Sequence, residues 1–388
     1  MKPLSGSFSN IAGFSTLGKH IGIKRAGQDF AVLFSDKICT AAAVYTSNQI
    51  QGASIAIDKQ HLANNMAQAV VINSGNANVA TGEQGIKNAK ETTVLVATEL
   101  GINADDVLVC STGVIGPQLP MEKIRNGVKG IKQDLGNSDD FAEAILTTDT
   151  RKKEICVTAY GFTIAGCAKG SGMIAPDMAT MLAFIATDAD INSHELSKLL
   201  KNCVASSFNM MSVDMDTSTS DTVIIMANGS VTVNIEQFRE VLEYVCQELA
   251  KMVARDGEGA TKLIICETRG AHSQSDARKV SKSIVTSNLV KTAVYGNDPN
   301  WGRLMMALGN SHAGKIEQDK IQISINQMLI VSGGKAASDY NAKILSTILS
   351  SSQEILIAID LNLGDYAAEA YGCDMSEDYI KINAEYTT

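Results

Sequence analysis

The sequence predicts a mixed α/β fold of the α+β kind, with helices and sheets layered as αββα. The first observation behind this prediction is a series of short apolar runs of strand length. The second is a set of helical stripes between those runs, and the third is a turn that joins two adjacent runs as a hairpin. A layered arrangement would bury both the strand faces and the helix stripes. The length of 388 residues suits one large domain or two medium ones.

Strands are expected where a short apolar run is bounded by polar or turn residues. Tyr160-Gly161 separates two such runs and is predicted to be the turn of an antiparallel hairpin, so the sheet is not purely parallel. The expected strands are 67–74, 106–111, the two arms of the hairpin within 154–168, 181–189, 222–229, 262–267, 320–325 and 354–361.

Helices are expected where apolar residues recur at three- and four-residue spacing. Asn192 or Ser193 can cap one helix, and Asn234 can cap a longer one that stops near Gly257. The first 190 residues are strand-rich, and the remainder is expected to mix strands with three helices. The four apolar stripes are Ile86, Ala89, Val96 and Leu100; Leu196, Leu199, Leu200, Cys203 and Val204; Ile235, Phe238, Leu242, Val245, Leu249 and Met252; and Ala277, Val280, Ile284 and Val285.

Composition excludes several functional classes. The net charge of −9, without a Lys/Arg cluster, argues against nucleic-acid binding, which needs a basic face. The N-terminus lacks the apolar core of a signal peptide, and no apolar run approaches the ~18 residues of a membrane span, so a soluble cytoplasmic protein is expected. The eight cysteines and five histidines are scattered, which favours buried thiols over disulfides and gives no reason to expect a metal site.

The stretch KGSGMIAPDMATMLAFIATDAD, residues 169–190, allows three interpretations. Residues 170–175 fit the dinucleotide pattern G-x-G-x-x-A, but only one apolar run separates them from Asp188, and a Rossmann unit needs a crossover helix and a second strand. The second interpretation is an ordinary glycine turn that leads into a core strand. The third is a latent nucleophile, Thr180.

A cut between Ala179 and Thr180 would make Thr180 an N-terminal residue. Its hydroxyl would attack the preceding carbonyl and shift the acyl group from nitrogen to oxygen, and water would then release the ester. The freed α-amine has a reference pKa of about 7.7–8.0, so it can serve as general base at neutral pH without a histidine. This chemistry would allow acyl transfer in a chain with no compact His, Cys and Asp constellation.

The segment KGSGMIAPDMATML resembles the self-cleavage signature of the ornithine acetyltransferases, the glutamate N-acetyltransferases of arginine biosynthesis. Further blocks resemble that family in the same order along almost the whole chain. They are VVINSGNANVATG (70–82), STGVIG (111–116), ILTTDT (145–150), SFNMMSVDMDTSTSDT (207–222), GEGATK (257–262), GNDPNWGR (296–303) and DYIKINAEYTT (378–388). The resemblance implies a two-domain αββα-like fold of the N-terminal-nucleophile type, cut into chains 1–179 and 180–388 that assemble as an α2β2 heterotetramer.

The resemblance also implies the catalytic residues. Thr180 would be the nucleophile of self-cleavage at Ala179–Thr180, and afterwards the residue that carries the acetyl group. Thr112 and Gly113, in STGVIG, would form the oxyanion hole from a hydroxyl and a backbone N–H. By themselves these two residues would be interpreted as a plain turn after a strand.

Five residues match substrate-binding positions of the family: Thr147, Lys169, Glu258, Asn383 and Thr388. The resemblance gives them this role, in addition to Thr180. A lysine suits the α-carboxylate of an amino acid, and a glutamate suits a substrate ammonium. Without the resemblance the lysine and the glutamate would be interpreted as solvated surface charges, and the two tail residues as part of a frayed chain end.

Four residues in similar blocks are expected to be structural: Asn76, Asp214, Asp216 and Trp301. The chain departs from the family between the two aspartates, where Met215 replaces the usual glycine. A side chain there could change a tight turn.

The implied reaction is a ping-pong transfer of acetyl from N2-acetylornithine through Thr180 to glutamate. It needs no cofactor, although acetyl-CoA would be a second donor in a bifunctional enzyme. Two alternatives remain open from the residues alone. One is a self-cleaving amidohydrolase or aminopeptidase with the same nucleophile and water as acceptor, and the other is a binding module that never cleaves.

Overall fold

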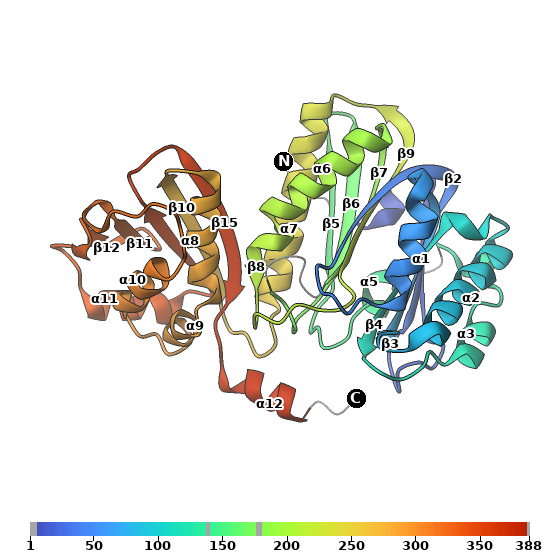
Figure 1. Ribbon diagram of the computed structural model, residues 1–388, viewed down its shortest axis with the longest axis horizontal. Coiled ribbons are helices and arrows are strands. Elements are labelled where there is room, and N and C mark those ends of the chain that lie inside the picture. The colour runs from blue at the N-terminus through green and yellow to red at the C-terminus, as the bar shows by residue number, and fades with distance from the viewer. Residues whose placement is uncertain (1–5, 137–139, 176–180, 386–388) are drawn as a thin grey trace. The chain divides into compact units, whose positions relative to one another are not determined.

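The computed structural model describes residues 6–136, 140–175 and 181–385, which form two compact units (Figure 1). The first unit contains Met1–Gly170, Asp177–Val204 and Thr217–Leu249, and the second contains Ser171–Pro176, Ala205–Asp216 and Ala250–Thr388. Each unit has its own β-sheet with helices packed against it. The predicted mixed α/β class and the two-domain organisation are therefore confirmed.

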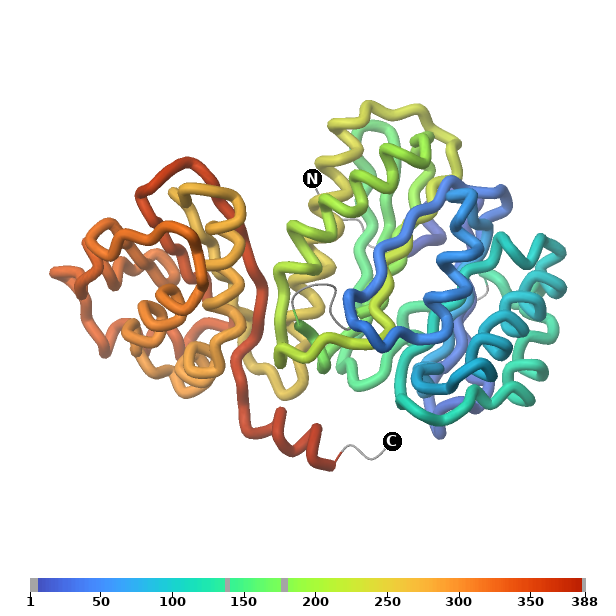
Figure 2. The backbone as a smooth tube through the Cα atoms, viewed as in Figure 1, coloured from blue at the N-terminus to red at the C-terminus, as the bar shows by residue number. Residues whose placement is uncertain are grey.

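The sheet of the first unit has the strand order β4-β3-β2-β9-β7-β6-β5, and β1 pairs with β2. The pairs β3–β4 and β7–β9 are parallel and the other pairs are antiparallel. Figure 2 shows the yellow-green segment of β9 returning beside the blue segment of β2, so residues far apart in sequence become neighbours. The strands are β1 (Phe14–Lys19), β2 (Phe30–Tyr45), β3 (Met66–Asn76), β4 (Val107–Val114), β5 (Lys153–Ala159), β6 (Phe162–Lys169), β7 (Leu182–Asp190) and β9 (Thr222–Thr232).

The predicted hairpin is formed by β5 and β6. Tyr160 and Gly161 join the two strands with φ values of 53° and 88°, the left-handed geometry of a tight hairpin turn. The next strand along the chain is β7, which pairs antiparallel with β6. The G-x-G-x-x-A pattern therefore does not lie in a strand–helix–strand unit, and the dinucleotide-binding interpretation is wrong.

The helices of the first unit cover the sheet. Glycine at 166 allows α7 to approach β6, because a Cβ atom there would lie 2.8 Å from Leu249. Asn192 and Asn234 accept hydrogen bonds from the first turns of α6 and α7, as predicted. The helices are α1 (Ala53–His61), α2 (Gly82–Leu100), α3 (Met121–Gly127), α4 (Ile131–Asp134), α5 (Phe141–Ala144), α6 (Ser193–Ser206) and α7 (Ile235–Arg255), of which the residues up to Leu249 belong to this unit.

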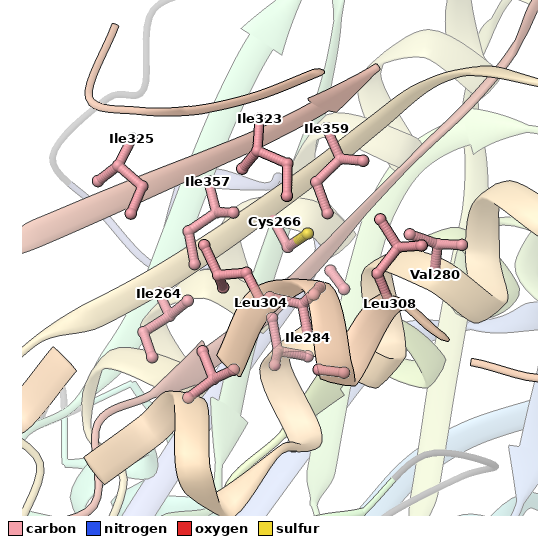
Figure 3. Close-up of a cluster of buried hydrophobic side chains, with 14 of the residues drawn as sticks. Ile264, Cys266, Val280, Ile284, Leu304, Leu308, Ile323, Ile325, Ile357 and Ile359 are labelled. Carbon is pink, nitrogen blue, oxygen red and sulfur yellow. The ribbon is translucent and has the colours of Figure 1, made fainter. Parts of the chain in front are cut away.

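The sheet of the second unit has the order β13-β12-β11-β14-β10-β15-β8. Figure 3 shows its core, in which Val280 and Ile284 of α8 and Leu304 of α10 face isoleucines of the sheet. The strands are β8 (Met211–Ser212), β10 (Leu263–Ala271), β11 (Gln322–Ile325), β12 (Met328–Ser332), β13 (Lys335–Ala336), β14 (Glu354–Asp360) and β15 (Tyr366–Cys373). The helices are α8 (Gln274–Thr286), α9 (Asn288–Tyr295), α10 (Trp301–Gly309), α11 (Ala342–Ser351) and α12 (Glu377–Glu385).

The structure differs from the sequence prediction in several respects, of which three are informative. The long strand β2 was not predicted, because charged residues interrupt its apolar pattern at a bulge between Phe34 and Cys39. Three helices after residue 190 were too few, since α9 to α12 are also present. Ile86 and Ile235 lie at the exposed beginnings of their helices rather than in the core.

All eight cysteines lie within the described residues, and each is a buried thiol outside any disulfide, as predicted. No helix of the described segments is long and apolar enough to cross a membrane. In the same segments, no cluster of histidine, cysteine and carboxylate side chains has the arrangement of a metal site.

Candidate active site

Thr112 and Gly113 lie at the end of β4, in the sheet of the first unit. Gly113 pairs with Gly75 of β3, and its φ of 128° lies in a region that favours glycine. A Cβ atom on Gly113 would overlap the backbone of Gly75. Thr112 is 6% exposed, and within the described residues no group hydrogen-bonds to its hydroxyl. The end of β4 therefore presents a buried hydroxyl on Thr112, directly before a backbone position that only glycine fits.

The neighbouring strand β3 fixes the end of β4 through amide side chains. Asn73 accepts a hydrogen bond from the Ser111 hydroxyl at 2.7 Å, directly before Thr112. Asn76 donates to the carbonyls of residues 117 and 118 at 3.2 and 3.1 Å, and its side-chain oxygen accepts from the Asn78 N–H. These contacts give Asn76 the structural role expected from sequence.

Thr147 and Lys169, predicted to bind substrate, are in direct contact in the first unit. The Lys169 ammonium donates to the Thr147 hydroxyl at 3.2 Å, and Lys169 is only 3% exposed. Thr147 precedes β5 and Lys169 ends β6, so the hairpin brings them together. Asp149 completes this group, because its carboxylate accepts from the N–H of Thr147 at 3.0 Å and of Gly170 at 2.6 Å.

Asp149 is the electrostatic centre of this group. It forms an ion pair of 2.6 Å with Lys153, and both side chains are fully buried. Burial favours the neutral carboxyl, but the charges of Lys153 and Lys169 outweigh it and lower the pKa of Asp149. Asp149 therefore remains ionised between two buried lysines, of which Lys153 forms the ion pair and Lys169 contacts Thr147.

The oxyanion candidates and the Thr147 group are linked within the first unit. The Ser74 hydroxyl donates to the carbonyl of Ala144 at 2.6 Å, and Ser74 pairs with Thr112 across the two strands. The Lys24 ammonium donates to the carbonyl of Leu146 at 3.1 Å. The loop before β5 is therefore attached to β3, the strand that pairs with β4 at Thr112.

In the second unit, the segment that follows Gly170 is anchored by Asp214. The carboxylate of Asp214 accepts from the N–H groups of Met173 and Ile174 at 2.6 and 2.8 Å. The carbonyl of Ile174 in turn accepts from the backbone N–H of Val213 at 2.9 Å. Asp214 therefore determines the course of the glycine-containing segment just before residue 176.

Glu258 and Asn383 also come together in the second unit. The amide of Asn383, in α12, donates to the Glu258 carboxylate at 2.7 Å. The Glu258 N–H donates to the carbonyl of Ser171 at 2.9 Å, and a Cβ atom on Gly172 would overlap the Glu258 carboxylate. The second glycine of the segment is therefore required so that the chain can pass beside Glu258.

Comparison with known proteins identifies the family. The model of the ArgJ family matches residues 15–388. An arginine biosynthesis bifunctional protein ArgJ 2 from Clostridium acetobutylicum is 45% identical over 378 residues, which is 97% of each chain. The corresponding protein of Listeria monocytogenes is 45% identical over the full length of both chains. The chain belongs to the ArgJ family.

A solved ArgJ structure gives a second comparison. The arginine biosynthesis bifunctional protein from Bacillus halodurans is 38% identical with a TM-score of 0.50. The match covers 98% of that solved chain but 52% of this one. The solved ArgJ chain is therefore about half as long as the sequence described here.

Ala179, Thr180 and Thr388 lie outside the described residues. The other predicted residues form two groups, each within one unit. Thr112, Gly113, Thr147 and Lys169 belong to the first unit, and Glu258 and Asn383 to the second.

Sequence analysis did not assign roles to the carboxylates Asp149 and Asp221. Both lie in blocks that resemble the ArgJ family, ILTTDT and the end of SFNMMSVDMDTSTSDT, and this was the available signal.

Met215 adopts a φ of 71°, so the position keeps the left-handed turn that glycine favours. The departure from the family therefore strains this turn without removing it.

Proposed function

We propose that this protein is an acetyltransferase of arginine biosynthesis, which moves the acetyl group of N2-acetylornithine to glutamate. Thr180, after self-cleavage at Ala179–Thr180, carries the acetyl group between the two substrates. The observation that carries the proposal is the family match over residues 15–388, which spans the cleavage position and all the site residues predicted from sequence.

Self-cleavage in this proposal has two steps. The Thr180 hydroxyl attacks the carbonyl of Ala179, so a C–O ester bond forms and the C–N peptide bond breaks, and the hydroxyl proton passes to the departing nitrogen. Water then cleaves the ester, which leaves a carboxylate on Ala179 and restores the hydroxyl of Thr180. The half-length solved chain of the Bacillus halodurans relative supports this proposal, because a cut before Thr180 would yield chains of about that size.

Strand pairing supports continued association of the two chains after the cut. β6 would belong to chain 1–179 and β7 to chain 180–388, yet they pair from Ile164↔Thr187 to Lys169↔Leu182. β2 and β9 would likewise belong to different chains and pair from Thr40↔Ala227 to Tyr45↔Thr222. The cut would therefore divide the sheet of the first unit between two chains without breaking its hydrogen bonds. Pairing of two such heterodimers into an α2β2 heterotetramer is part of the proposal.

The transfer cycle uses the new N-terminus twice. The α-amine of Thr180 takes the hydroxyl proton as the oxygen attacks the acetyl carbonyl of N2-acetylornithine, and the proton leaves with the ornithine amine. Glutamate then attacks the acetyl ester through its amine and restores the hydroxyl. The Thr112 hydroxyl and the Gly113 N–H stabilise the negative oxygen in both halves. Each such donor contributes about 2.7–4 kcal/mol in comparable sites.

Charge on the first unit supports binding of an anionic substrate group. Lys169 is buried beside Thr147, while Lys153 is already compensated by Asp149. A buried cation of this kind favours the α-carboxylate that N2-acetylornithine and glutamate share. Glu258, whose side chain accepts from Asn383, is proposed to bind a substrate ammonium, and Thr388 is proposed to contribute from the tail.

The proposal includes no resident cofactor. The word "bifunctional" in the names of the relatives supports a second activity, in which acetyl-CoA replaces N2-acetylornithine as donor. We include this activity as the alternative form of the proposal. A cytoplasmic location is also proposed, and the eight buried thiols support a reducing compartment.

Intact mass and N-terminal sequencing of the purified protein test the proposal. Wild type and Thr180→Ser, which keeps a hydroxyl, should give two chains, and Thr180→Ala should give one uncut chain. The cleaved protein should transfer labelled acetyl from N2-acetylornithine to glutamate. Release of acetate to water, without transfer, would instead indicate an amidohydrolase. Persistence of uncut wild type at neutral pH would contradict the proposed nucleophile.

A further inference from the structure

In the first unit, the end of β6 lies beside the start of β7, which in turn lies beside the start of β9. Lys169, the last residue of β6, pairs with Leu182, the first residue of β7, and Leu182 pairs with Thr222, the first residue of β9. Met181 and Asp221 each lie one residue before these strand starts. The sheet therefore places Asp221 beside the residue that follows Thr180 in the chain.

Asp221 holds the backbone of Met181. The N–H of Met181 donates to Oδ1 of Asp221 at 2.8 Å, and the carbonyl of Met181 accepts from the Thr222 N–H at 3.1 Å. The Asp221 carbonyl accepts from the Thr46 N–H at 3.0 Å, so the loop that carries Asp221 is itself attached to the end of β2. Both polar groups of the Met181 backbone are thus bound, and Asp221, which binds the N–H, is only 1% exposed.

The second carboxyl oxygen of Asp221 has no such partner. Oδ2 is buried, and no hydrogen bond reaches it from the described residues. A buried polar atom without a hydrogen bond lowers the stability of the folded protein, so a carboxylate at this position needs an explanation. Asparagine has the same length and could also accept from the Met181 N–H through one oxygen, without burial of an ionisable group.

The environment of Asp221 favours its neutral form. Burial raises the pKa of its carboxyl, against smaller opposing effects of the Met181 N–H, the Lys169 charge and the Ser218 side chain. Lys169 is the charged group that acts on Asp221, and the charge of Lys169 also helps to lower the pKa of Asp149.

We infer that Asp221 is a positioning residue for the nucleophile, which fixes the Met181 amide with one oxygen and offers the other as an acceptor in the reaction of Thr180. The inference rests on the proposed function, because it requires Thr180 to become a chain start. Met181 is bonded directly to Thr180, so an anchor on its N–H restricts the direction in which the chain leaves Thr180. The second oxygen is then available to the hydroxyl or the new amine of that residue.

The experiment compares full-length Asp221→Asn and Asp221→Ala with wild type. Asp221→Asn keeps an acceptor for the Met181 N–H but replaces Oδ2 with an NH2 group. Asp188→Asn is the matched control, because the Asp188 carboxylate accepts from the Thr163 N–H at 2.8 Å at the opposite end of β7. The rate of self-cleavage is followed by intact mass, and thermal unfolding confirms that each variant is folded.

Self-cleavage should slow about 100-fold in Asp221→Ala and at least about tenfold in Asp221→Asn, since small displacements of reacting groups cost factors of this order. In cleaved Asp221→Asn, kcat should fall while KM for glutamate changes less than about threefold, because the substrate contacts remain. Asp188→Asn should behave as wild type.

Two results would overturn the inference. One is a folded Asp221→Asn that cleaves and transfers acetyl at the wild-type rate, and the other is an equal slowing in Asp188→Asn. Asp221→Asn decides the question alone if Asp221→Ala does not fold. Failure of wild type to cleave would be a different result, because it would refute the proposed function itself.

Discussion

Substitution of Asp149 by alanine should destabilise the first unit strongly. The change removes the 2.6 Å partner of Lys153 while leaving the lysine in a fully buried position. It also removes the acceptor for the Thr147 and Gly170 N–H groups. Breaking a buried ion pair from one side costs about 3–5 kcal/mol. That is a large part of the ~5–15 kcal/mol by which native proteins are stable.

The effect should depend on pH in a definite direction. The pKa of Asp149 is lowered in the folded protein from its ordinary value of 3.8. Its contribution is therefore present above the ordinary pKa and is lost as the pH falls through the lower, folded pKa. The difference in stability between wild type and Asp149→Ala should be full at neutral pH and shrink only in acid below pH 3.8.

Urea unfolding at neutral pH measures this difference. Far-UV circular dichroism follows both units, and fluorescence of Trp301, the only tryptophan, reports on the second unit. Asp134→Ala is the control, because Asp134 forms a part-exposed ion pair with Lys19 at 3.1 Å, and such pairs contribute less than about 1 kcal/mol. The double variant Asp149→Ala/Lys153→Met should recover part of the loss, because the charge of Lys153 is no longer buried without Asp149.

A loss below about 1 kcal/mol in Asp149→Ala would refute this reasoning, since it would place Asp149 in the range of a surface pair. A double variant no more stable than Asp149→Ala would show that Lys153 is not the source of the cost.

Three further substitutions test the site and its strained turn. Thr112→Ala should lower kcat about 100- to 1000-fold with little change in KM, whereas Thr112→Ser should retain most activity, and steady-state kinetics would reveal either outcome. Glu258→Gln should raise KM for ornithine-type substrates about tenfold with a smaller change in kcat, because it removes charge but keeps an acceptor for Asn383; an unchanged KM would exclude Glu258 from substrate binding. Met215→Gly should stabilise the second unit by up to about 1 kcal/mol, seen as a later Trp301 fluorescence transition, because a φ of 71° suits glycine better than methionine. An earlier transition would contradict the proposed strain.

Much of the local structure could be predicted from sequence because its causes are local. The hairpin at Tyr160-Gly161 depends on two adjacent residues, and the caps at Asn192 and Asn234 depend on side chains that bond to the next turn. The apolar strands β3, β4, β7 and β9 are recognisable because their burial requires continuous apolar runs. The candidate site residues were found in another way, by the resemblance of whole blocks to one family.

β2 and β15 show where the prediction of strands from local residue patterns fails. β2 is interrupted by Asp36 and Lys37, and it extends through both halves only because β3 and β9 pair with it on its two sides. β15 is rich in alanine, which has a low preference for strands, and it is held by β10 and α8. In both cases neighbouring elements override the local preference.

The sequence alone determined the class of fold, the family and the identity of the candidate nucleophile, Thr180, since these depend on residue types in chain order. Tertiary structure decided which carboxylates hold the backbone on either side of the candidate cleavage position. Asp149, Asp214 and Asp221 bind backbone N–H groups of residues 170, 173, 174 and 181 only after folding. Asp214 and Asp221 lie about forty positions along the chain from the groups they bind. Burial acts on the charge states of all three carboxylates, and lysines of β5 and β6 act on those of Asp149 and Asp221. No local pattern of residues encodes either effect.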